Sequence, residues 1–125
     1  MNTPANLKYT KSDEWFDPES GKAGITDYAQ SQLSDIVFVE LLVEEGDTLE
    51  AGKPIASVES VKASAEIYSP ASGKVVAVNK DLSDKPETIN SDPFGGAWMI
   101  QLEGGSAAES MDSAAYEQYC EERSQ

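Results

Sequence analysis

The chain has 125 residues, with 23 Asp and Glu against 9 Lys and Arg, a formal net charge of −14, no His and one Cys. Its length suits one core, so we expect a single domain over residues 1–125 with a flexible start at residues 1–6. Without His, and with Cys120 alone, neither a disulfide framework nor a Cys/His zinc site can form. We therefore predict no metal site, and a conventional enzyme is disfavoured.

The charge and the first residues bear on partners and location. A surface this acidic repels phosphate backbones and anionic lipids, which argues against nucleic acid and membrane partners. The N-terminal residues lack the basic start and apolar stretch of a secretory signal, and no apolar run approaches the ~18 residues of a membrane span. We therefore predict a cytoplasmic protein.

The first third of the chain predicts short strands and one helix. The strands are expected at Leu7–Thr10, Glu14–Phe16 and Lys22–Ile25. A short helix then extends to Leu33, with Thr26 or Asp27 as its N-cap. Asp27 in that position would place Gln30 at the third helical residue, which is the spacing of a capping box.

The middle of the chain consists of short apolar or alternating runs separated by Gly and Pro turns. Strands are expected at Ile36–Val43, Ile55–Glu59, Ala63–Tyr68 and Lys74–Val78, with a break at residues 69–73. Strands this short, interrupted about every 8–12 residues, favour a small sandwich or barrel over an open α/β sheet.

The last third predicts a small helix, a closing strand and a C-terminal helix. Pro86 begins the small helix to Asn90, Ala97–Leu102 is the closing strand, and residues 104–108 are a flexible link. A C-terminal helix over about residues 112–122 is expected from the i, i+4, i+8 repeat of Met111, Ala115 and Tyr119. The residues assigned to packing are Trp15, Phe38, Tyr68, Trp98 and Cys120.

Lys62 stands where two expected strands meet with almost no connecting residues. That position predicts the tip of a hairpin, where a four-carbon stem holds the amine away from the body of the protein. Small or apolar neighbours leave the amine accessible to the active site of another protein. Gly46 and Gly73, each in a turn of its own, frame the lysine. An ordinary solvated turn lysine is the alternative.

The segment Glu59-Ser60-Val61-Lys62-Ala63 resembles the lipoyl-lysine hairpin. The Val61-Lys62-Ala63 centre differs from the Asp-Lys-Ala typical of lipoyl domains of 2-oxo acid dehydrogenases and from the Met-Lys-Met of biotin carriers. Further segments are similar to the glycine cleavage system H protein family, and together they cover about residues 7–119. These segments are Asp13–Trp15, Gly24–Gln30, Val37–Leu41, Ile89–Phe94 and Trp98–Ile100.

The resemblance implies a mainly β fold, a lipoyl/biotinyl-type hybrid barrel-sandwich with short helices and a C-terminal helix. It also implies that Lys62 is amide-linked to lipoic acid and that the chain has no catalytic residue of its own. The residues implied in recognition by the attaching enzyme are Glu59, Val61, Ala63, Gly46 and Gly73. The residues implied in a cleft where the loaded arm rests are Glu14, Ser12 and Glu66.

The function implied is that of a carrier in the glycine cleavage system. The arm would take the aminomethyl group of glycine from the pyridoxal-phosphate glycine decarboxylase to the tetrahydrofolate-dependent aminomethyltransferase, and dihydrolipoyl dehydrogenase would reoxidise it. A lipoate-attaching enzyme is a fourth partner. Two alternatives stay open, an octanoyl or lipoyl relay carrier for other proteins and an unmodified acidic interaction domain.

Three positions depart from the family pattern. The family usually has His at the positions of Asp13 and Tyr28, and Asp at the position of Glu66. None of the three belongs to the attachment segment around Lys62. The departures therefore bear on how the arm rests or how a partner docks, and not on the attachment itself.

Overall fold

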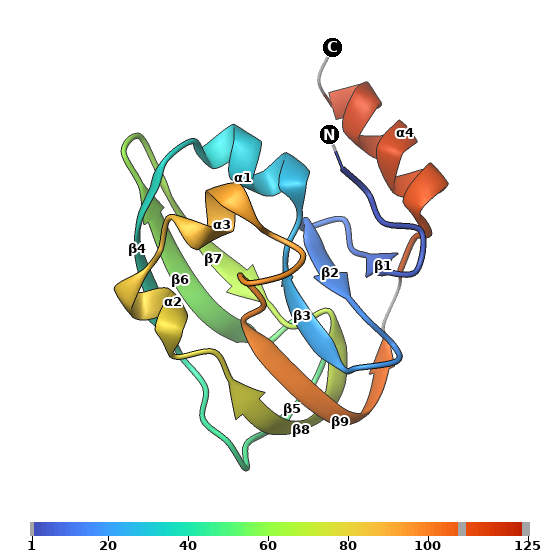
Figure 1. Cartoon of the computed structure of the whole chain (residues 1–125). Coiled ribbons are helices and arrows are strands. Elements are labelled where there is room, and N and C mark those ends of the chain that lie inside the picture. The colour runs from blue at the N-terminus through green and yellow to red at the C-terminus, as the bar shows by residue number, and fades with distance from the viewer. Residues whose placement is uncertain (1, 108–109, 124–125) are drawn as a thin grey trace.

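Two antiparallel sheets form the body of the molecule, which the computed structural model describes over residues 2–107 and 110–123 (Figure 1). The six-stranded sheet has the order β1 (Lys8–Tyr9), β2 (Glu14–Phe16), β3 (Lys22–Ile25), β9 (Ile100–Ala107), β8 (Ala71–Val78), β5 (Thr48–Leu49). The three-stranded sheet has the order β4 (Ile36–Leu41), β6 (Pro54–Ser60), β7 (Ser64–Tyr68). The expected mainly β architecture is confirmed.

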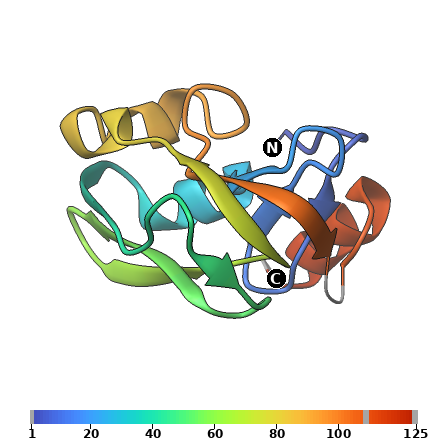
Figure 2. The same cartoon turned by 90° about the horizontal axis from the view of Figure 1, so that it is seen from below.

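Four helices accompany the sheets in the described part of the chain: α1 (Asp27–Leu33), α2 (Asp81–Asp84), α3 (Thr88–Ser91) and α4 (Ser113–Arg123). Thr26 is the N-cap of α1, because its hydroxyl accepts a hydrogen bond from the backbone N–H of Ala29 at 3.2 Å. Asp27, the other candidate, instead accepts a bond from the Gln30 side chain at 2.6 Å. The C-terminal helix α4 lies on the opposite side of the molecule from the β6–β7 hairpin (Figures 1 and 2).

Two clusters of buried side chains hold these elements together. The larger includes residues from both sheets, among them Ile25, Val58 and Val75. The smaller joins α4 to β1 and β2, and it contains Tyr9, Trp15, Tyr116 and Cys120. Tyr9 and Tyr116 stack with ring centroids 4.7 Å apart. Trp15 and Cys120 therefore pack as predicted.

The long β8–β9 pair corrects two expectations. β8 begins at Ala71, so the predicted break at residues 69–73 is shorter than expected. β9 continues to Ala107, which replaces the predicted flexible link over residues 104–107; residue 108 lies outside the described residues. The reason is a distant partner, since Ala71 pairs with Ala107 and Ser72 with Ser106. The sequence alone assigns this segment to a loop because it is rich in Gly and Ser. In the structure, hydrogen bonds to β8 satisfy its backbone groups.

Two more expectations about helices are corrected. The buried face of α4 carries Tyr116 and Cys120, whereas Ala115 of the predicted face is exposed. The predicted helix at residues 86–90 starts later, as α3, and α2 was not predicted. No helix in the described ranges is long and apolar enough to cross a membrane.

Phe38 is exposed, not packed as predicted. A β-bulge between Ile36 and Phe38 shifts the β4–β6 register and breaks the alternation on which the packing assignment relied. Tyr68 and Trp98 are partly buried.

The start of the chain contacts both α1 and β1. The backbone N–H of Asn2 donates to Asp27 at 2.7 Å, and the Tyr9 hydroxyl donates to the carbonyl of Pro4 at 2.5 Å. The flexibility expected of residues 1–6 stays a prediction.

Candidate functional site

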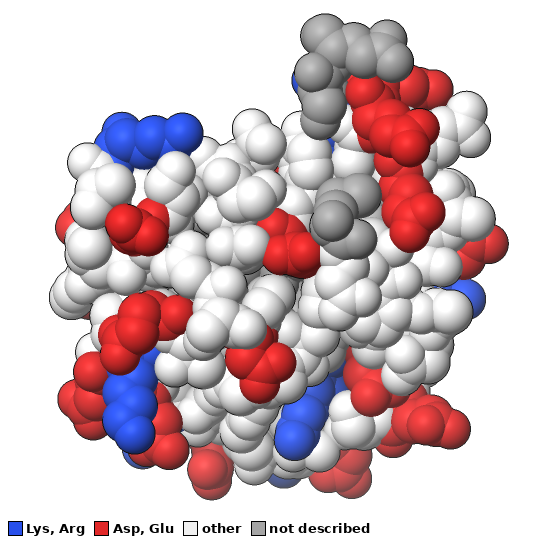
Figure 3. Space-filling view, turned by 45° about the horizontal axis from the view of Figure 1, so that its top comes forward, with Lys and Arg blue, Asp and Glu red and all other residues white. Residues whose placement is uncertain are grey.

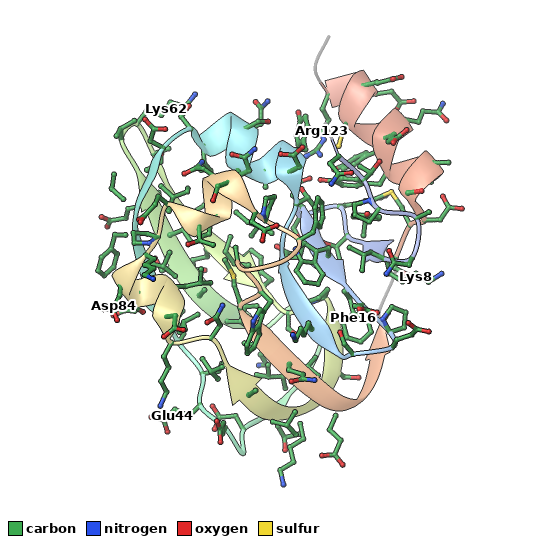
Figure 4. All side chains as sticks on the ribbon, in the orientation of Figure 1. Lys8, Phe16, Glu44, Lys62, Asp84 and Arg123 are labelled. Atoms are coloured by element: carbon green, nitrogen blue, oxygen red, sulfur yellow. The ribbon has the colours of Figure 1, made fainter. Side chains whose placement is uncertain are left out.

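Lys62 lies at the tip of the β6–β7 hairpin, where Glu59 pairs with Ser64 and the four residues 60–63 connect them. Ser60 closes this turn. Its hydroxyl accepts hydrogen bonds from the backbone N–H groups of Lys62 and Ala63, at 3.3 and 3.1 Å, and donates to the carbonyl of Ala63 at 3.1 Å. Lys62 is exposed, and its side chain projects outward from the end of the molecule (Figure 4). The turn is thus ordered while the amine is accessible.

The neighbours of Lys62 on the tip are exposed as well. Val61 and Ala63 flank it, and the backbone N–H of Val61 donates to the carbonyl of Asp35 at 3.1 Å. That bond ties the tip to the start of β4. Glu59 is exposed on β6, opposite Phe38 of β4. The structure therefore brings Glu59, Val61 and Ala63 together around Lys62, and their part in recognition stays a prediction.

Gly46 and Gly73 are not near the tip. Gly46 lies two residues after Glu44, which is at the end of the molecule opposite Lys62 (Figure 4). Its N–H donates to the carbonyl of Val75 at 2.8 Å, and Gly73 pairs with Leu49 of β5. Gly46 lies in a turn as expected, whereas Gly73 lies within β8 and not in the turn expected for it, because the strand begins at Ala71. A role for the two glycines in recognition stays a prediction.

A cleft of about 680 Å³ opens at the base of the same hairpin. β7 leads from the tip to this cleft, since Tyr68, the last residue of the strand, lines it. Tyr68 is six positions after Lys62 in the sequence, which is about 20 Å of extended chain. Other lining residues are Thr10, Ser12, Glu14, Pro70 and Met111.

Glu14 is the buried charged group of this cleft, with 1% of its surface exposed, and the exposed Lys11 lines the cleft as well. Oε1 accepts hydrogen bonds from the hydroxyls of Thr10 and Ser12 at 2.8 and 2.6 Å, and Oε2 accepts one from the backbone N–H of Tyr68 at 3.4 Å. Burial raises the pKa of the Glu14 carboxyl to about 6, against these hydrogen bonds, which lower it. At neutral pH the group is therefore ionised, and it is costly to leave without a positive partner.

Thr10 was missed by the sequence analysis. Thr10, Ser12 and Glu14 are spaced by two, and this polar alternation was the available signal. Glu66, the third expected cleft residue, is not among the residues that line the cleft. It is exposed on β7, and the Tyr68 hydroxyl donates to its carboxylate at 3.3 Å. Residues 64, 66 and 68 share one face of the strand, so Glu66 lies on the path between the tip and the cleft.

Comparison with known proteins identifies the family. A family model described as Glycine cleavage H-protein matches residues 7–124. The chain belongs to this H-protein family. It is 50% identical over 123 residues to proteins named Glycine cleavage system H protein from Bacillus cytotoxicus and Bacillus cereus, covering 97% of this chain and 96% of each relative.

A solved structure agrees with the sequence relatives. The crystal structure of a glycine cleavage system H protein from Mycobacterium marinum superposes with a TM-score of 0.83 at 33% identity, covering 98% of this chain and 99% of that one. The expected family and its lipoyl-type barrel-sandwich fold are therefore confirmed. H proteins are the carrier component of the glycine cleavage system, as the resemblance implied.

The two positions where this H protein has no family His contact one residue, Arg123 of α4. Its guanidinium donates to both carboxylate oxygens of Asp13 and lies 4.5 Å from the ring centroid of Tyr28. It also lies 4.1 Å from the ring centroid of Tyr119. Asp13 stands between Ser12 and Glu14 of the cleft, so Arg123 holds the turn that carries them. Sequence reasoning missed this contact, which spans 110 residues.

Proposed function

We propose that Lys62 is the residue to which lipoic acid is attached by an amide bond, and that the chain carries the aminomethyl group of glycine on this arm. The observation that supports this most directly is the exposed Lys62 amine on a turn closed by the Ser60 hydroxyl. A primary amine on an ordered and exposed tip fits an acylation site, because another enzyme can enclose it without unfolding the hairpin.

The residues of the chain have two tasks in this proposal. During attachment, the deprotonated Lys62 amine attacks an activated acyl group in the lipoate-attaching enzyme, and the activating group leaves. Glu59, Val61 and Ala63 present the tip to that enzyme. The bound lipoyl group then supplies a dithiolane, a redox-active sulfur pair that a chain with one buried Cys lacks.

Between partners, the cleft at the base of the hairpin shelters the carried group. The ionised Glu14 carboxylate, already held by Thr10 and Ser12, accepts a charge-assisted hydrogen bond from the protonated amine of the carried group. Ser12 and Glu66 give further polar contacts on the same path. The cleft thereby excludes water from a group that water would release.

The partners follow from the carrier role. They are the glycine decarboxylase, the aminomethyltransferase, dihydrolipoyl dehydrogenase and the lipoate-attaching enzyme. The chain is not itself a catalyst in this scheme: tethering raises the local concentration of the arm at each enzyme. A cytoplasmic location stays a prediction.

Intact mass tests the attachment. After expression in a host supplied with lipoate, the protein is expected to gain the mass of one lipoyl group, and Lys62→Arg is expected to lack that gain. The Arg variant keeps the charge of the tip, so it is the matched control. An unmodified wild-type protein would contradict the proposal and favour an acidic interaction domain.

Glycine–bicarbonate exchange with the decarboxylase separates a glycine cleavage carrier from an octanoyl or lipoyl relay. The lipoylated protein is expected to act as the acceptor in this reaction and to support exchange. A protein that is lipoylated and inactive in exchange, yet passes its acyl group to another apo lipoyl domain, would be a relay carrier.

A further inference from the structure

The bulge in β4 exposes two adjacent apolar side chains beside the hairpin tip. Val37 is 54% exposed and Phe38 is 48% exposed. In a regular strand one of two neighbours would point into the core. Here Ile36 pairs with Ser60 and Phe38 with Glu59, so the bulge turns both residues 37 and 38 to solvent.

Val61 extends this surface to the residue that precedes Lys62. It is 67% exposed, and its backbone bond to Asp35 holds it against the start of β4. We call Val37, Phe38 and Val61 the β4 patch. Exposed apolar groups that gather in one place, with an aromatic residue among them, are characteristic of interaction sites.

The charges around the β4 patch define the chemistry of what it binds. Asp35, Glu40 and Glu59 are exposed carboxylates on the elements that carry the patch, and the exposed Lys80 lines a groove together with Phe38. The space-filling view shows a basic side chain at the hairpin end of the molecule with acidic side chains close to it (Figure 3). A complementary partner therefore has an apolar pocket for Phe38 with Lys or Arg around it.

The position of the β4 patch indicates which enzyme this partner is. An enzyme that acylates the Lys62 amine has to enclose the tip, and it covers Val61 when it does so. In the three-stranded sheet β4 and β7 lie on opposite sides of β6. β7 leads to the Glu14 cleft, whereas β4 runs in the same direction along the other edge of the sheet and contributes no residue to the cleft lining. The patch is thus beside the tip but outside the path proposed for the loaded arm.

We propose that the β4 patch is the docking surface for the enzyme that acylates Lys62, an inference that rests on the proposed attachment at that residue. Phe38 is the central contact, with Val37 and Val61 beside it and Glu59 pairing with a basic residue of the enzyme.

The test is the rate at which a lipoate-attaching enzyme modifies the unmodified full-length protein, followed by intact mass. Phe38→Ser is expected to lower kcat/KM about tenfold or more, mainly through a higher KM. Val76→Ser is the matched control, because Val76 is an apolar residue of β8 that is 38% exposed and lies in the other sheet. It is expected to be modified at the wild-type rate.

Three outcomes are informative. Equal rates for wild type, Phe38→Ser and Val76→Ser would overturn the docking surface while leaving attachment at Lys62 intact. A Phe38→Ser protein that is acylated normally but fails in exchange with the decarboxylase would also overturn it, since the patch would then serve another partner. An unmodified wild-type protein would contradict the attachment itself. Unchanged melting temperatures exclude misfolding as the cause of a slow variant.

Discussion

Arg123, in the last turn of α4, donates two hydrogen bonds to Asp13, one from each terminal nitrogen, at 3.1 and 2.6 Å. Asp13 has a positive φ of 73° and also accepts a bond from the Tyr116 hydroxyl at 2.8 Å. Its carbonyl accepts the N–H of Thr26 at 3.0 Å. One strained residue thus joins α4, the start of α1 and the turn that carries Ser12 and Glu14.

Removal of the guanidinium is expected to loosen α4. Arg123→Gln should lower the free energy of unfolding by about 1–2 kcal/mol, since a bidentate ion pair and two cation–π contacts with Tyr28 and Tyr119 are lost. Arg123→Lys should recover only part of this, because an ammonium cannot make the paired bonds. Urea denaturation followed by circular dichroism measures the difference.

A double-mutant cycle with Asp13→Asn isolates the pair. Asn tolerates the left-handed backbone, so this variant removes charge without adding strain. We expect a coupling energy of roughly 0.5–1 kcal/mol. Additive effects would show that Arg123 acts through the tyrosine rings alone. Glu121→Gln, an exposed change on the same helix, should stay within about 0.5 kcal/mol of wild type.

The buried carboxyl of Glu14 should give the protein a distinctive pH dependence. Its pKa is about 6 in the folded state and 4.5 in the reference state, so the folded protein binds this proton more tightly. The free energy of unfolding is therefore greatest below about pH 4.5 for this group and falls by about 2 kcal/mol as the pH rises through 6. The difference between wild type and Glu14→Gln in urea titrations from pH 4 to 7 measures it. Parallel curves for the two proteins would contradict the buried acid.

The same carboxylate is expected to protect the carried aminomethyl group. Glu14→Ala should leave lipoylation intact and speed loss of that group about tenfold, which corresponds to one charge-assisted hydrogen bond. In wild type the loss should also accelerate in acid, as Glu14 takes up a proton. It should do so below pH 6, because the positive charge of the carried amine lowers the pKa of the carboxyl from its value of about 6 in the unloaded protein. Release of formaldehyde from the loaded protein gives the rate. Glu40→Ala, an exposed carboxylate on β4, should match wild type, and an equal rate in Glu14→Ala would remove Glu14 from this role.

Two glycines with similar backbone angles should respond differently to Ala. Gly21 and Gly46 have φ of 80° and 96°. A Cβ at Gly21 would clash with the carbonyl oxygen of Leu102, whereas a Cβ at Gly46 meets nothing within 4 Å. Gly46→Ala should therefore cost only the backbone strain, about 1–2 kcal/mol, and Gly21→Ala clearly more. Equal losses in urea denaturation would refute the clash at Gly21.

Much of the attachment end was predictable because its signals are local. Lys62 between two short apolar strands indicates a hairpin tip without knowledge of any distant residue. In the other sheet, the strand at Lys22–Ile25 was likewise predicted with its observed bounds. The family resemblance added the cleft residues Ser12 and Glu14, which the structure places 2.6 Å apart.

The features that were missed depend on distant partners. Residues 104–107 look like a link until β8 is present to pair with them. The exposure of Phe38 comes from one extra residue in β4, and a slip of one residue exchanges the two faces of a strand. The buried face of α4 is the one that packs against Tyr9 and Trp15, and the helical repeat within α4 does not reveal these distant partners. The raised pKa of Glu14 depends on burial, which brings Tyr68 from 54 residues away against the carboxylate.

β7 separates Lys62 from the Glu14 cleft by a fixed number of residues. If the loaded arm folds back along this strand, the length of the strand has to match the length of the arm. Two residues added to both β6 and β7 would keep every side chain on its face and carry the tip about 7 Å further away. Such a protein would still be lipoylated at the tip, but the group carried on the arm would no longer reach the Glu14 cleft.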